Sequence, residues 1–577
     1  MKKNKLYIGI GAIILLTFIL NGCSDFLDIN PKNFITDDKV WATTSNADLF
    51  LNDIYEQLPN INGETEHLDQ FTDNSDVGVL WMRGYANIAT AQLTPSSKEI
   101  DVPDKMWLWS KSYERIRKCN IFIKKVSEST LPDDYKKLRL AEARFLRALF
   151  YHWLWKAHGG VSVIEVPLDN ITMGDGIYYP RSTTRQTFEF ITTELREIAD
   201  DLPLKITNSG DYGRPTKGAA LTLKGWCELY EASALRNPSN DIERWKLAAK
   251  TNKEVMDLGV YDLFDDFAGL FMESNNNNIE SIFARQHGPK KGTSIDFKQG
   301  PTMNGVGAQV GWGNSQPTQE LVDEFSMANG KATYEDGSGY DPQDPYTGRE
   351  KRFYQTILYD GSPWRGYTID TRVGGTNEID LGYAGDKTHT GYFARKRLDE
   401  SKSPSDSQNG ESYQNYMYFR FAEVLLSYAE AENEVNGPTK DVLDAVNRVR
   451  TRDNNLPTVQ ATYGTIDKDK MREIIRRERR VELSFEDKRW WDILRWKIAD
   501  KLPDGSPGVL NRPEKGMYIT ENGDGTLNYK VVDVRNRIFL PKMYLMPVPQ
   551  SVIDQNPSIE AQNGGEDNWN KGQNPGY

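Results

Sequence analysis

The sequence has few of the residues that cross-link small secreted proteins or bind metals. Its 577 residues include three cysteines and five histidines. Three cysteines do not make a disulfide framework, and Cys119 and Cys227 fall inside helical patterns, where we expect small buried hydrophobic side chains. The histidines lack the His-Glu-x-x-His spacing of a zinc peptidase, so no catalytic or metal-binding residue is assigned. They are His67, His152, His158, His287 and His389.

Positive charge is also scarce. There are 71 lysines and arginines against 83 acidic residues, a net charge of −12. A protein that neutralises phosphates needs clustered basic residues, so we expect no nucleic-acid partner. A hydrophobic content of 38% and a mean hydropathy of −0.64 exclude a multi-span membrane protein.

The N-terminus has the pattern of an export signal. Three lysines precede an uncharged apolar stretch from Leu6 to Leu20, which is too short to span a bilayer comfortably. The segment Leu20-Asn21-Gly22-Cys23 resembles a bacterial lipobox. We therefore expect residues 1–22 to be a lipoprotein signal peptide and Cys23 to carry the lipid. The mature chain, 23–577, would have a charge of −15.

Apolar residues recur at three- and four-residue steps in much of the chain, which predicts amphipathic helices. Such helices in antiparallel-looking pairs suggest a tetratricopeptide-like solenoid, although no clean 34-residue repeat is present. We expect this helical scaffold mainly in residues 36–270 and 418–500. The predicted helical segments are Lys105–Val126, Leu138–Ala157, Thr187–Asp200, Ala219–Tyr230, Trp245–Leu258, Tyr418–Tyr428, a helix beginning at Asp441, and one longer segment, Lys470–Ile498.

Two regions, 271–417 and 501–577, read as loop-rich. The first begins with the polar run Asn275–Asn278 and contains many Gly, Pro, Ser, Asn and Asp residues, with short strands such as Phe353–Leu358. From Pro503 onward we expect mostly loop. The acidic stretch Asp336–Asp344 could hold calcium, but its spacing is not that of an EF-hand, and a solvated turn is the default. No other cofactor is expected.

Several segments, in order along the mature chain, resemble the SusD/RagB family of Bacteroidetes outer-membrane lipoproteins. The acidic residues just after Cys23 are similar to the surface-export signal of such lipoproteins. The strongest match is Arg476–Leu483 with Arg489–Trp496. The others are Cys23–Asp28 with Pro31, Ala141–Ala148 with His158–Val161, Gly213–Ala220, Arg420–Leu426, Asn447–Arg450, Tyr544–Gln550 with Asn556-Pro557, and Gln573–Tyr577.

This resemblance implies a mainly α fold, a single domain over residues 23–577 with four tetratricopeptide-like helix pairs and a large loop-rich face. Members are not enzymes. The resemblance implies a lipid-anchored outer-membrane protein facing the cell exterior, a SusC-like TonB-dependent transporter as partner, and an oligosaccharide as ligand.

Aromatic residues make up 11% of the chain. A sugar ring stacks on an aromatic face while its hydroxyls need polar partners, so aromatics in loops matter more than aromatics in helices. Trp490, Trp491 and Trp496 have helical spacing and are expected in the core. Trp81, Trp312 and Trp364 lie in loop-like segments and could either bind sugar or plug the loop layer. The candidate glycan-binding residues are these three with Tyr85, Arg83, Asn74, Asn314 and Tyr367.

Other interpretations remain open at this point. The basic run Arg476–Arg480 could bind an anion, but on a helix it more plausibly forms a salt-bridged structural surface with neighbouring glutamates. The same scaffold could carry peptides instead of glycans, which would require backbone-pairing groups along a groove. A glycosidase needs only two suitably spaced carboxylates, and 83 acidic residues leave that possibility open.

Overall fold

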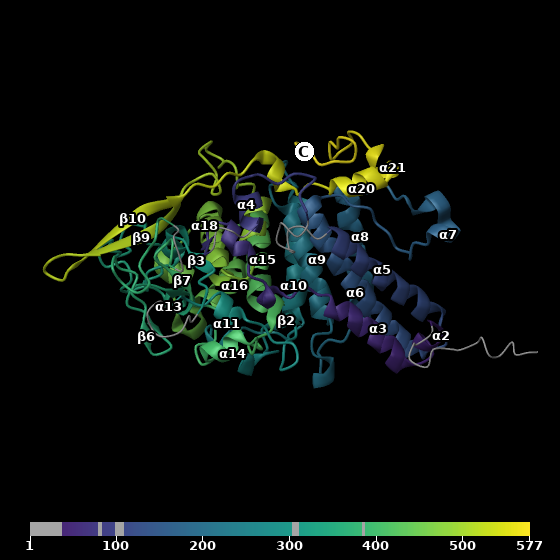
Figure 1. Cartoon of the computed structure of the whole chain (residues 1–577), viewed down its shortest axis with the longest axis horizontal. Coiled ribbons are helices and arrows are strands. Elements are labelled where there is room, and N and C mark those ends of the chain that lie inside the picture. The colour runs from purple at the N-terminus through teal and green to yellow at the C-terminus, as the bar shows by residue number, and fades with distance from the viewer. Residues whose placement is uncertain (1–36, 79–82, 99–108, 303–310, 383–386) are drawn as a thin grey trace, which may run out of the picture.

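A computed structural model describes residues 37–78, 83–98, 109–302, 311–382 and 387–577 (Figure 1). The fold is mainly α, and eight helices pack in an unbroken series in which each contacts the next. Taken two at a time, they form four pairs, the tetratricopeptide-like arrangement predicted from the sequence. In order these helices are α5 (Trp109–Glu128), α6 (Asp133–His158), α8 (Thr184–Ile198), α9 (Lys217–Ala232), α10 (Ile242–Asp257), α15 (Phe421–Asn436), α16 (Lys440–Thr451) and α18 (Lys468–Glu482).

Local signals define where these helices begin and end. The Thr183 side chain caps α8 and forms a reciprocal capping box with Gln186. Asp133 and Asp134 lie in the first turn of α6, where their charge complements the helix dipole. This helix stops at Gly159, whose φ of 77° suits glycine. The other described α-helices are α2 (Asp37–Val40), α3 (Thr44–Glu56), α4 (Arg83–Ala89), α7 (Asn170–Met173), α11 (Ile295–Lys298), α12 (Gln319–Glu324), α13 (Lys351–Thr356), α14 (Pro404–Gln408), α17 (Val459–Tyr463), α19 (Arg489–Arg495), α20 (Gln550–Gln555) and α21 (Pro557–Glu560).

Aromatic side chains fill the space between the helices. The rings of Trp155 and Tyr230 lie 5.3 Å apart, and those of Trp226 and Tyr230 lie 5.2 Å apart. Cys119 and Cys227 are both fully buried and unpaired, as predicted. Burial raises the pKa of the Cys119 thiol to about 12, so it stays protonated and chemically quiet.

Within the described residues, the strands form five antiparallel sheets of two strands each, and three of these join segments that are distant in sequence. Figure 1 shows the last pair as a long hairpin that projects from one end of the molecule. The pairs are β1 (Ser75–Val77) with β3 (Ser315–Pro317), β2 (Ser281–Arg285) with β8 (Tyr416–Arg420), β4 (Ile357–Leu358) with β7 (Phe393–Ala394), β5 (Pro363–Trp364) with β6 (Tyr367–Thr368), and β9 (Glu514–Glu521) with β10 (Leu527–Arg535).

Three local predictions differ from the structure. The segment Phe353–Leu358 is mostly the end of helix α13, with only two residues of strand. The chain after Pro503 contains the β9–β10 hairpin rather than loop alone. The predicted segment Lys470–Ile498 is two helices, because Phe485 and Asp487 adopt left-handed conformations with φ of 59° and 60°. The Asp487 carboxylate accepts hydrogen bonds from the Leu68 amide and the Tyr416 hydroxyl, which fixes this turn.

The basic run on α18 is structural, as predicted, but buried rather than on the surface. Arg477, Arg479 and Arg480 are each at most 7% exposed. Arg480 pairs with Asp73 at 3.2 Å and with Glu324, at the end of α12, at 2.8 Å, so its partners come from other segments of the chain. Trp490, Trp491 and Trp496 are also buried, as expected.

The predicted signal peptide, residues 1–22, and Cys23 lie outside the described residues. Of the helices that are described, none is both long and apolar enough to cross a membrane.

Candidate functional site

One tryptophan in the described ranges presents its ring to solvent. Trp312 is 36% exposed, whereas every other described tryptophan is at most 8% exposed. The Trp312 backbone amide donates to the Phe297 carbonyl at 2.9 Å. The centroids of the Trp312 and Phe297 rings lie 5.5 Å apart, with their planes inclined at 60°. The indole thus packs against Phe297 and is partly open to solvent. Such a surface suits stacking against a flat apolar face of a ligand.

Close backbone packing holds the Trp312 loop in place. The Gly313 amide donates to the Gly300 carbonyl at 2.8 Å, and the Gly78 amide donates to the Asn314 carbonyl at 3.0 Å. A Cβ atom on Gly311 would lie 2.2 Å from the Gly300 oxygen, and one on Gly78 would lie 2.3 Å from the Gly313 oxygen. These positions therefore require glycine.

The β1–β3 pair brings two predicted binding segments together. Val77 is paired with Ser315, so the chain that leads towards Trp81 runs beside the chain that carries Trp312. Trp81 itself lies outside the described residues. Arg83 is the first residue of α4, but its side chain is also outside the described part. Their roles in binding stay predictions.

A buried charged cluster lies on β1. The Asp76 carboxylate contacts His389 Nδ1 at 3.2 Å and also pairs with Arg535. Burial would raise the pKa of Asp76, but the hydrogen bond to His389 and the charges of Arg535 and Arg537 outweigh it and hold that pKa below its ordinary value. Because Asp76 is fully buried and paired, its carboxylate anchors the strand.

The loop before β1 is anchored in the same way. The Asp73 carboxylate accepts two hydrogen bonds from Arg489, both at 2.8 Å. Arg537 donates to the Ser75 carbonyl at 2.8 Å and pairs with Glu514. Arg489 of α19 thus holds Asp73, and Arg537, which follows β10 and pairs with Glu514 of β9, holds Ser75 at the start of β1. The site rests on a rigid base, which reduces the entropy lost when a ligand binds.

Asn314 is the buried polar side chain nearest to Trp312 in sequence. It is fully buried, and neither its carboxamide oxygen nor its nitrogen has a hydrogen-bond partner in the described structure. Its backbone carbonyl, in contrast, accepts from the Gln70 side chain at 2.8 Å. An unsatisfied buried amide costs about 1–3 kcal/mol, so the structure retains here a polar group that a water molecule or a ligand hydroxyl would satisfy.

Three other candidate residues prove to be buried. Trp364 is 1% exposed and packs with Ile295 and Phe393 in a small hydrophobic cluster, so its ring is not available for stacking. Asn74 is fully buried, with its side chain bonded to Asp69 and Arg480. Tyr85 is 5% exposed. Their burial argues against direct contact with ligand, which stays a prediction for these three side chains.

Tyr367 is 41% exposed at the start of β6. Its position opposite Trp364 in the β5–β6 pair places an accessible ring on the same small hairpin as a buried one. Within the described residues, no ring contact joins Tyr367 to Trp312. Its contribution to binding remains a prediction.

The sequence did not predict the residues that hold strands β1 and β3 in place beneath the site. His389 and Arg535 lie far from Asp76 in the chain, and Gln316, which accepts from the His389 amide at 2.7 Å, gave no local signal. Only spatial proximity reveals these partners, because no spacing rule connects positions 76, 316, 389 and 535.

Two family models match the chain. One, described as the SusD family, matches residues 279–569. The other, described as "Starch-binding associating with outer membrane", matches residues 25–224.

Individual relatives match most of the chain. SusD-like protein P38 of Formosa agariphila is 26% identical over 86% of this chain and 93% of its own length. A SusD-like protein of Bacteroides ovatus is 25% identical over 82% of this chain and 83% of its own length. Among solved structures, a SusD-like carbohydrate-binding protein of Bacteroides fragilis superposes with a TM-score of 0.74 at 27% identity, covering 90% of this chain and 99% of that one.

Proposed function

The chain belongs to the SusD family, and from this premise we propose that it is a glycan-binding lipoprotein of the outer membrane that delivers oligosaccharides to a SusC-like TonB-dependent transporter. The Trp312 surface is the observation that carries the glycan assignment. The ring is accessible and lies on a loop held by glycine contacts. The similarity of the whole chain to a SusD-like carbohydrate-binding protein of known structure also supports a glycan as the ligand.

Separate observations support the lipid anchor, the membrane location and the transporter partner. The lipobox-like segment ending at Cys23 supports a lipid anchor. The description of the second family model, which names the outer membrane, supports the location. The transporter follows from the family resemblance. In this role the protein needs no catalytic group, since it captures the ligand and releases it unchanged.

Replacing Trp312 by alanine is expected to weaken glycan binding about tenfold or more, because the loss of a stacked aromatic anchor removes about 1.4 kcal/mol or more of binding energy. The melting temperature is expected to stay within about 4 °C of the wild type, because the ring is partly exposed. Affinity electrophoresis against a polysaccharide panel, followed by calorimetry with the retained glycan, measures the first effect, and thermal denaturation measures the second.

Tyr334→Ala is a suitable control, since Tyr334 is an exposed ring, 62% accessible, whose charged neighbours are Glu324, Arg477 and Glu473. It should bind glycan like the wild type. Retention of no glycan together with binding of a peptide would favour the peptide-carrier alternative. Release of products from an oligosaccharide panel would instead indicate a glycosidase.

Replacing Cys23 by alanine is expected to abolish lipid attachment and to move the protein from the membrane fraction to the soluble fraction. The reason is that the thiol is the acceptor of the lipid and, by the proposal, the sole anchor. Fractionation and labelling with a fatty-acid analogue check this result. Membrane retention of the unlabelled variant would point to anchoring through a protein partner, and co-purification with a TonB-dependent transporter would test that route.

A further inference from the structure

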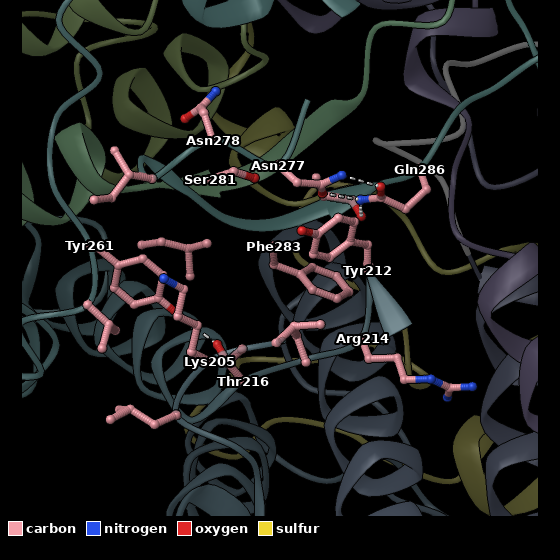
Figure 2. A pocket seen from close by; sticks show the side chains of 17 residues that line it. Lys205, Tyr212, Arg214, Thr216, Tyr261, Asn277, Asn278, Ser281, Phe283 and Gln286 are labelled. Carbon is pink, nitrogen blue, oxygen red and sulfur yellow. Dashed lines mark hydrogen bonds between the residues drawn. The ribbon is translucent and has the colours of Figure 1, made fainter. Parts of the chain in front are cut away.

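Two sequence features that the Trp312 surface does not use meet in a separate pocket. They are the segment Gly213–Ala220, which leads into α9, and the polar run Asn275–Asn278, which precedes β2. Together with the loop around Lys205, they enclose a pocket of about 220 Å³ (Figure 2). This volume lies below the roughly 300–1,000 Å³ of pockets for drug-sized ligands. The occupant is therefore small, of the size of one sugar ring.

Tyrosine rings form part of the wall. Figure 2 shows Tyr261 on one side of the pocket and Tyr212 on the other. Tyr212 lines the pocket and is 44% exposed, so part of its side chain is accessible to solvent. The Tyr261 hydroxyl is bonded to the Thr216 hydroxyl at 2.7 Å. The Tyr261 ring packs against Gly218. A Cβ atom at position 218 would lie 2.4 Å from this ring, so the ring can occupy this place only because residue 218 is glycine.

Amide side chains lie beside Tyr212 at the edge of the pocket (Figure 2). Asn277 and Gln286 exchange two hydrogen bonds, both at 2.9 Å (Figure 2). Gln286 lies over Gly213, where a Cβ atom would approach its Cγ to 2.7 Å. Asn415 donates a further bond to Gln286 at 2.9 Å. The pocket is thus shaped before any ligand arrives, which lowers the entropy cost of binding.

The charge of the lining selects among ligand classes. Arg214 lines the pocket, but its guanidinium is engaged by Glu142 at 2.7 Å and Asp211 at 3.0 Å. In Figure 2 it points away from the pocket. Lys205 is then the remaining charged side chain in the lining, too few for a site built for phosphate or sulfate. Hydroxyls and amides both donate and accept, as sugar hydroxyls do.

We propose that this pocket is a second glycan site that binds a single neutral sugar ring, with Tyr212 as its stacking surface and the Asn277–Gln286 pair as its polar edge. The inference rests on the proposed function. Its lining shares no residue with the Trp312 loop. Two sites on one molecule let a long glycan bind at both, so polysaccharide affinity exceeds that of either site alone wherever the chain can span them.

The test uses the glycan retained in the panel and a short oligosaccharide prepared from it. Calorimetry of the wild type is expected to give two oligosaccharides per protein. Tyr212→Ala and Trp312→Ala should each give one, the double variant none, and Tyr334→Ala two. Tyr212 has no hydrogen bond from its hydroxyl in the described structure and is half exposed, so its loss should not unfold the protein. Polysaccharide affinity should fall at least tenfold in each single variant.

A stoichiometry of one for the wild type, unchanged by Tyr212→Ala and abolished by Trp312→Ala, would overturn the second site while leaving the proposed function intact. Loss of all binding in Tyr212→Ala with normal binding in Trp312→Ala would support the pocket and overturn the assignment of Trp312. A wild type that binds no glycan in any form would overturn the proposed function, and the second glycan site with it.

Discussion

Glu482→Ala is expected to lower the free energy of unfolding by about 3–5 kcal/mol, the cost of removing one partner from a buried ion pair. The remaining arginines would keep their charge in a site that no longer compensates it. Glycan binding by the folded fraction should change little, because Glu482 lies on the scaffold helix α18.

The contacts of Glu482 explain the size of the effect. Its carboxylate pairs with Arg420 at 2.8 Å, with Arg352 at 3.0 Å and with Arg452. All four side chains are at most 3% exposed. Arg352 and Arg452 come from outside α18, and Arg420 ends strand β8, so this carboxylate joins the loop-rich region to the helical scaffold.

Chemical denaturation of the variant measures the loss. Glu473→Ala is a matched control on the same helix, because the Glu473 side chain is 47% exposed and pairs only with Lys470 in the described structure. It should change stability by no more than about 0.5 kcal/mol. Equal effects of the two substitutions would show that the buried cluster contributes no more than a surface pair.

The free energy of unfolding should also depend on pH, because Arg420 pairs with a second buried carboxylate, that of Glu486. Burial would raise the pKa of Glu486, but Arg420 and Lys396 outweigh it and lower that pKa to about 2. A carboxyl with a lowered native pKa binds fewer protons folded than unfolded. Its stabilisation is therefore complete above the ordinary pKa of about 4.5 and is lost as the pH falls towards 2.

The helical scaffold was predictable because each helix carries its own signal. The three- and four-residue steps of apolar residues in α6 and α9 predicted helices, and the structure shows helices there that are buried nearly all round, α9 along most of its length and α6 from Phe145 to His158. The break between α18 and α19 was not predictable. It depends on Asp487 contacting Leu68 and Tyr416, which are distant in the chain. The β9–β10 hairpin was missed because much of β10 is exposed and polar.

The candidate site was predictable only in part, for a related reason. Trp312 and Trp364 both lie among glycines and polar residues, and nothing local distinguishes them. Trp364 is buried because Ile295, Leu358 and Phe393 surround it from three other segments. Trp312 is open because the Gly311 and Gly313 contacts hold its loop at the surface. Which of these two tryptophans is accessible to a ligand depends on the segments that the fold packs around each ring, and the neighbouring sequence does not show which segments these are.

Lys156→Met is expected to raise the free energy of unfolding at pH 7 by about 1–4 kcal/mol, the range found when buried ionic groups are replaced by hydrophobic residues of similar size. Lys156 is 8% exposed in α6. Its ammonium lies 4.5 Å from the ring centroid of Trp491 and 5.3 Å from that of Trp226. Within the described residues, no carboxylate forms a salt bridge with it. Methionine would fill the same space without a charge.

The pH dependence separates this explanation from simple repacking. Burial, with repulsion from Lys488, lowers the pKa of Lys156 to about 7 from its ordinary 10.5. The native state therefore binds fewer protons than the unfolded state between those values, and the cost of the buried lysine is full below pH 7 and disappears as the pH rises to about 10.5. The gain from Lys156→Met should shrink over the same interval.

Denaturation of Lys156→Met at pH 7 and pH 9.5 provides the measurement, with Lys137→Met as a control on the same helix. The Lys137 side chain is 64% exposed, so its substitution should change stability by about 0.5 kcal/mol or less at either pH. A Lys156→Met variant less stable than the wild type at pH 7 would mean that the two tryptophan faces stabilise the cation by more than burial costs. A gain that stays constant with pH would mean that packing, and not charge, is responsible.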